Sequence, residues 1–165
     1  MTSLRDAIVA HPTLAPATHK KPKEGGVDIE GLAVHDGWLY AGLRGPLHGS
    51  NALVLRFRFE DPTGTARLLA IDLGGLGIRD LTRVSDGFLI LAGPMDAAAG
   101  PYQLHHWDGQ GDPNGKARRL CTIPAKAGAK AEGLGVLRED PEGYEFLILY
   151  DGPEGGDPKH FRIKK

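Results

Sequence analysis

The chain has 165 residues, enough for one domain with its own core, and its formal net charge is −1. This near-zero charge excludes a general attraction to nucleic acid or to a membrane, and the single cysteine excludes an intrachain disulfide. No apolar run reaches the roughly 18 residues of a membrane span, and the first ten residues lack the apolar run of a signal peptide. We therefore expect a cytoplasmic protein without nucleic-acid or membrane partners.

Residues 1–27 are predicted to form a short N-terminal helix and a linker. Ser3 can cap a helix that runs to Ala10, with Leu4, Ala7 and Ile8 on one apolar stripe. The two prolines that follow, Pro12 and Pro16, stop the helix because proline cannot continue its hydrogen bonding.

The segment DIEGLAVHDGWLYAGLRGP, residues 28–46, predicts a hairpin with strands at residues 29–34 and 38–43. The turn between them is Asp36-Gly37. Two further strands follow at residues 51–59 and 67–73. In residues 51–59 the residues alternate strictly: one face carries Leu53, Leu55, Phe57 and Phe59, and the other carries Val54, Arg56 and Arg58.

This pattern recurs twice, at residues 78–94 and 131–153, and each copy ends in Gly-Pro. The second unit predicts strands at residues 78–84, 88–91, 102–107 and 118–123. The third unit predicts strands at residues 132–137, 145–150 and 160–164, and it lacks a fourth.

Units of four short antiparallel strands that recur roughly every 50 residues are typical of β-propeller blades. We predict an all-β, propeller-like fold with blades at residues 28–73, 78–123 and 131–164, together with the short N-terminal helix. A single meandering β-sandwich is the alternative. The repeated turn chemistry favours the propeller.

Three blades cannot close a ring that normally needs about four to eight. We expect two copies of the chain to pair about a two-fold axis into a six-bladed ring, or a different segment to supply the missing half. The open edge of the third blade also needs a cover, and we expect the N-terminal segment or a strand of the partner copy to provide it.

Candidate functional residues lie on the first strand of each unit, because these strands line a propeller's channel. Glu30, Arg79 and Glu132 fall at equivalent positions, and Asp80 follows Arg79. Channel carboxylates need a partner. Glu30 and Glu132 either bind a Ca²⁺ or Mg²⁺ ion or a substrate, or form an ion-pair ring with Arg79 that keeps the blades in register.

Two further candidates lie near the expected channel mouth. Asp28 is either a ligand or an acceptor for backbone amides of a turn. Arg44 either binds a small anionic ligand or forms a salt bridge with a neighbouring blade.

Other catalytic patterns are missing from the sequence. His105 and His106 are adjacent on a strand, so they point to opposite faces and cannot chelate one ion together. The serines do not lie in a G-x-S-x-G motif, which disfavours a serine hydrolase.

The segment KPKEGGVDIEGLAVHDGWLYAGLRGPL, residues 21–47, resembles the bacterial "domain of unknown function 3616" family in its D-I-E-G-L-A and G-L-R-G-P motifs. The segments LGGLGIRDL, ILAGP, AKAEGL and LYDGP also fit that family. The chain resembles the C-terminal half of a member. The family is similar to phytase-like and esterase-like propellers, a resemblance that implies a fold more firmly than an activity.

Because no catalytic set is complete, we expect a ligand-binding or scaffold propeller that pairs with itself. The alternative is a metal-dependent phosphoesterase or esterase-like hydrolase, in which channel carboxylates hold a metal that activates water. Whether the protein is an enzyme stays open at this point.

Overall fold

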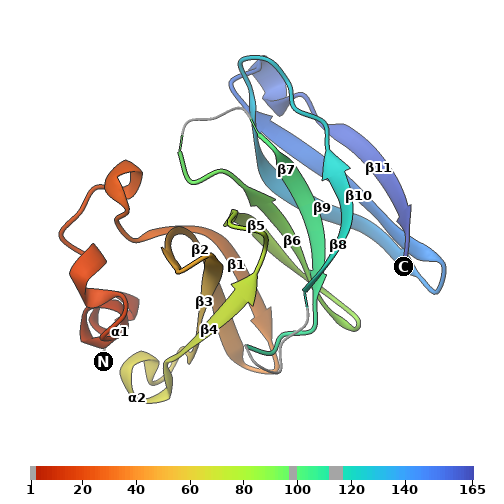
Figure 1. Ribbon diagram of the computed structural model, residues 1–165. Coiled ribbons are helices and arrows are strands. Elements are labelled where there is room, and N and C mark those ends of the chain that lie inside the picture. Colours follow the sequence, from red (N-terminus) through yellow and green to blue (C-terminus); the bar gives the residue numbers. More distant parts are fainter. Residues whose placement is uncertain (1–2, 97–99, 112–116) are drawn as a thin grey trace.

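The computed structural model describes residues 3–96, 100–111 and 117–165, which form three antiparallel sheets arranged side by side (Figure 1). The first sheet has the order β1-β2-β3-β4, and the second has the order β5-β6-β7-β8. The third has the order β11-β10-β9 and is one strand shorter. This confirms the all-β, half-propeller-like prediction, including the missing strand of the third unit.

The strands of the first sheet are β1 (Asp28–His35), β2 (Trp38–His48), β3 (Asn51–Arg58) and β4 (Arg67–Asp72). Those of the second are β5 (Gly77–Val84), β6 (Gly87–Gly93), β7 (Tyr102–Trp107) and β8 (Ala117–Ile123). Those of the third are β9 (Lys130–Asp140), β10 (Gly143–Asp151) and β11 (Lys159–Lys164). Most predicted strand bounds agree within two residues, and β2 is longer because pairing resumes beyond Pro46 at His48 and Asn51.

The predicted Asp36-Gly37 turn joins β1 to β2. Both residues have positive φ, 49° and 72°, which is the backbone of a two-residue hairpin turn of type I′. Arg58 Nη1 donates a hydrogen bond of 2.9 Å to the Asp36 carbonyl and fixes the turn to β3.

The strand alternation places a separate apolar core on each side of a sheet. Val54 on β3 belongs to the core between the first and second sheets, with Ile78, Phe88 and Trp107. The second and third sheets share another core, which includes Leu91, Tyr102, Leu134, Phe146 and Ile148. Because β6 is buried on both faces, the second sheet is the centre of the stack.

The first two sheets approach closely at a glycine. A Cβ atom at Gly42 would lie 2.6 Å from Ile78 Cγ2, so only glycine permits this separation.

The N-terminal segment packs on the first sheet. Helix α1 (Leu4–Ala10) begins with a capping box in which Ser3 and Asp6 satisfy each other's backbone amides. Two buried residues of this segment, Ile8 and Leu14, pack with Leu43, Leu53 and Leu55 on the face of the first sheet that turns away from the second. Short helices η1 (Ala15–Ala17), η2 (Pro22–Glu24) and α2 (Pro62–Thr65) complete this end.

The expectation that the N-terminal segment covers the open edge of the third unit is therefore wrong. Figure 1 shows α1 and the third sheet at opposite ends of the stack. The apolar stripe of α1 finds an apolar sheet face to bury it, whereas β11 exposes charged residues such as Lys159, Arg162 and Lys164. Charged side chains on an edge strand discourage further pairing, and a cover from a partner copy stays a prediction.

A 3-10 turn, η3 (Glu154–Gly156), links β10 to β11. Within the described ranges, none of the helices is long and apolar enough to cross a membrane.

Candidate functional site

The inner strands β1, β5 and β9 each carry a β-bulge at the candidate site. The register of β1 against β2 shifts between Ile29 and Gly31, so Glu30 is the extra residue. The same shift occurs at Arg79 in β5 and at Glu132 in β9. A bulge leaves one residue outside the ladder and redirects its side chain, and bulges are frequent beside functional sites.

Arg79 of the central sheet joins the two glutamates of the outer sheets. Its Nη1 lies 3.2 Å from Glu30 Oε2 and 3.2 Å from Glu132 Oε1. Its Nη2 donates to the Pro94 carbonyl at 2.7 Å. The Arg79 side chain is inaccessible to solvent, whereas both glutamates are partly exposed. The three sheets are thus connected at their inner edges by one buried guanidinium group.

Arg44 extends the ion pairs along the first sheet. Its Nη1 lies 3.0 Å from Glu30 Oε1, and its Nη2 contacts Asp28 Oδ2. The charges therefore alternate along the series Asp28, Arg44, Glu30, Arg79 and Glu132. Of the two readings offered for Arg44, the structure contains the salt bridge, although its partners belong to its own sheet and not to a neighbouring blade.

Asp80 lies beside this series but contacts backbone atoms. One of its oxygens accepts a hydrogen bond from the Leu134 amide at 2.7 Å, and the other accepts one from the Leu81 amide at 2.7 Å. Thr82 donates to the Leu134 carbonyl at 3.0 Å. Asp80 and Thr82 thereby hold both backbone groups of Leu134 and join the second sheet to the third.

Burial and the bonds to neighbouring groups shift the pKa values of Glu30 and Asp80 in opposite directions. Burial raises the pKa of Glu30, and the guanidinium groups of Arg79 and Arg44 oppose this rise. Burial also raises the pKa of Asp80, against the two amide hydrogen bonds from Leu134 and Leu81.

The hypothesis that Glu30 and Glu132 bind a metal ion can be compared with the positions of the side chains that could act as ligands. Within residues 3–96, 100–111 and 117–165, no group of three or more His, Cys, Asp and Glu side chains is arranged to hold an ion. Glu30 and Glu132 direct oxygens to the same Arg79 nitrogen. In this chain the two glutamates share one guanidinium group, and binding of Ca²⁺ or Mg²⁺ by Glu30 and Glu132 stays a prediction.

The two adjacent histidines behave as expected for neighbours on a strand. His105 is buried and its Nε2 lies 3.0 Å from Gln103 Oε1, while His106 Nε2 lies 3.1 Å from Asp86 Oδ1. Within the described residues, the two imidazole rings contact different partners.

Sequence reasoning placed Glu30, Arg79 and Glu132 at equivalent positions but missed the bulges and the contact with the Pro94 carbonyl. It also missed Tyr102, whose ring lies 6.0 Å from the Arg79 guanidinium carbon. The recurring Gly-Pro at the end of each repeat could have indicated Pro94. It follows the last residue of β6 that pairs with β5, where a backbone carbonyl is free of the sheet.

Comparison with protein-family models matches residues 1–160 to a family described as "Protein of unknown function (DUF3616)". The match spans almost the whole chain, so the chain belongs to this family. Comparisons with curated proteins and with solved structures find no match.

Proposed function

We propose that this member of the DUF3616 family is a binding or scaffold module, and that its channel-edge charges hold the three sheets together. The supporting observation is the position of Arg79, which is buried between Glu30 and Glu132 of two different sheets. A guanidinium group that is inaccessible to solvent and bonded to two carboxylates is not available to bind a substrate.

The charge balance of the site supports the same proposal. Asp28, Glu30 and Glu132 face Arg44 and Arg79, so the carboxylates exceed the guanidinium groups by one. This excess reduces the attraction of Arg44 for an anion. The small anionic ligand expected near Arg44 therefore stays a prediction, and we place ligand or partner binding on the outer surfaces of the sheets.

The alternative, a metal-dependent phosphoesterase or esterase, rests on the excess carboxylate and on the resemblance to phytase-like and esterase-like propellers. It can be tested with a panel of phosphate monoesters, carboxylic esters and lactones, each with EDTA, Ca²⁺ or Mg²⁺. We expect no turnover above the uncatalysed rate in any condition.

Metal-dependent turnover that disappears in Glu132→Gln, with an unchanged circular dichroism spectrum, would contradict the proposal. Arg162→Gln is the matched control, because this exposed arginine lies on β11 outside the series.

A further inference from the structure

One leucine recurs on the inner strand of each sheet, and its environment differs between copies. Leu32, Leu81 and Leu134 occupy equivalent positions, one residue after Gly31, Asp80 and Gly133. Leu81 is 2% exposed in the core shared with the first sheet, and Leu134 is 6% exposed in the core shared with the second. Leu32 is 59% exposed. In two sheets this leucine packs on the preceding sheet, and in the first sheet it is open.

The neighbourhood of Leu32 is an apolar groove of about 420 Å³. It is formed mainly by Leu4, Leu32, Leu39, Phe57 and Phe59. Phe59 is largely exposed, as is Val34 two residues beyond Leu32. The groove continues the apolar face on which α1 packs, so α1 covers part of this face and leaves the part near β1 open.

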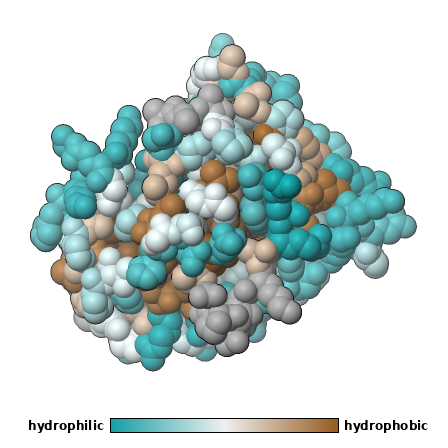
Figure 2. Space-filling view, in the orientation of Figure 1, coloured by the Kyte–Doolittle hydropathy of each residue, from teal (hydrophilic) through white to brown (hydrophobic). Residues whose placement is uncertain are grey.

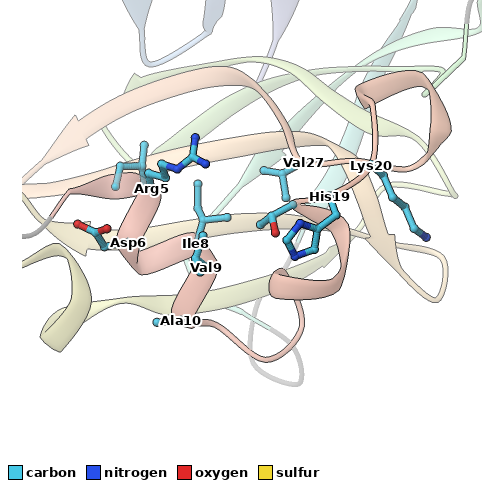
Figure 3. A pocket seen from close by; sticks show the side chains of 10 residues that line it. Arg5, Asp6, Ile8, Val9, Ala10, His19, Lys20 and Val27 are labelled. Atoms are coloured by element: carbon cyan, nitrogen blue, oxygen red, sulfur yellow. The ribbon is translucent and has the colours of Figure 1, made fainter.

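A second groove, of about 750 Å³, adjoins the first because Leu4 lines both. Figure 3 shows α1 on one side of it, with Ile8 in the middle and the segment carrying His19, Lys20 and Val27 on the other. Val9 on α1 is half exposed. The two grooves have Leu4 in common. Figure 2 shows hydrophobic patches between hydrophilic ones on the viewed face of the molecule.

The opposite end of the stack carries the complementary position. Gly31 on the first sheet packs against Leu81 of the second sheet. The equivalent residue on the third sheet is Gly133. Leu149 of β10 is the cross-strand neighbour of Gly133 and covers it, since a Cβ at Gly133 would lie 3.0 Å from Leu149 Cβ. Leu149 and Leu137 are both exposed, and Gly135 next to them has open space around it.

We propose that these two ends bind each other between two copies of the chain, so that Leu32 of one copy packs on Leu149 of the other, above Gly133. The occupant of the Leu32 groove is inferred from contacts between sheets within one chain. There, the leucines equivalent to Leu32 lie at Gly31 or Asp80 of the preceding sheet. Two such contacts related by a two-fold axis join three sheets from each copy into a ring of six, a number within the range of about four to eight.

The position of α1 is compatible with this contact. Helix α1 covers the middle of the first sheet at Leu43, Leu53 and Leu55, whereas Leu32 lies on the inner strand. Helix α1 therefore leaves the part of the inner strand near Leu32 open for the contact with a second copy.

The test is solution mass by size exclusion with light scattering, over a hundredfold range of concentration, for the full chain. We expect a species of twice the chain mass. Leu32→Glu and Leu149→Glu change opposite ends of the stack and should each raise the dimer dissociation constant by at least about tenfold. Both positions are exposed, so the circular dichroism spectrum should stay unchanged.

Met95→Glu is the matched control, because Met95 is an exposed apolar residue that lines neither groove and does not lie on the third sheet. Its mass should equal that of the wild type. A mixture of Leu32→Glu and Leu149→Glu chains retains one intact junction and should dimerise more tightly than either variant alone.

Three results would overturn the proposal. A wild-type chain that is monomeric at all concentrations would show that the contact does not form. Loss of dimer in Leu32→Glu alone would show that two first sheets pair with each other. A mass that grows beyond two chains with concentration would show an open, non-closing assembly.

Discussion

Replacing Arg79 by methionine removes the group that connects the inner edges of the three sheets. The change deletes two contacts of 3.2 Å to Glu30 and Glu132 and one of 2.7 Å to the Pro94 carbonyl. Removing one partner of a buried ion pair costs about 3–5 kcal/mol. Because both glutamates are partly exposed and regain water, we expect a loss of about 3 kcal/mol in the free energy of unfolding.

Urea unfolding followed by circular dichroism measures this loss. For a chain of this length, about 3 kcal/mol corresponds to a melting temperature lower by roughly 6–12 °C. The double variant Arg79→Met/Glu30→Gln should recover part of the loss, since it removes one of the carboxylates left without a partner.

Arg162→Met is the control for Arg79→Met. Arg162 is exposed and lies 3.7 Å from Glu142 on the surface, so its removal should change the free energy of unfolding by no more than about 0.5 kcal/mol. If Arg79→Met behaves like Arg162→Met, the reasoning about the buried guanidinium group is refuted.

Three other predictions concern the cores and the pH dependence. Gly42→Ala places a Cβ 2.6 Å from Ile78 Cγ2 and should cost about 1–3 kcal/mol in urea unfolding, whereas a neutral result would mean that the first two sheets can separate freely. Leu14→Ala should cost about 2–5 kcal/mol in the same assay, because Leu14 is fully buried, and a loss below about 1 kcal/mol would show that the N-terminal segment is not part of the core. Burial lowers the pKa of His105 from 6.5 to about 4, so the unfolded chain takes up a proton first as the pH falls. About 3 kcal/mol should therefore be lost between about pH 6.5 and about pH 4, and His105→Gln should lack this loss when unfolding is measured across that range.

Much of the fold could be predicted from local pattern. The alternation of Leu53, Val54 and Leu55 gives the strand and its two faces, and Asp36-Gly37 gives the turn, because both signals depend on a few neighbouring residues. The docking of α1 on the first sheet was not predictable in this way. Its apolar stripe specifies that an apolar surface covers it and does not specify which sheet provides that surface.

The candidate site was predictable in its residues and not in its geometry. Equivalent positions in the repeats identify Glu30, Arg79 and Glu132, because repeats place equivalent residues on adjacent inner strands. The bulges that redirect these side chains depend on register, which is set by pairing across whole strands. The contact between Asp80 and the Leu134 backbone likewise depends on how closely two sheets approach.

The claim that the channel-edge carboxylates are occupied by guanidinium groups can be tested most directly by measuring metal binding. Calorimetric titration of the purified chain with Ca²⁺ and with Mg²⁺, at low ionic strength, should show no stoichiometric binding, and Glu132→Gln should give the same trace as the wild type. One ion bound per chain in the wild type and none in Glu132→Gln, with both proteins folded, would contradict the account and return the site to metal-dependent chemistry.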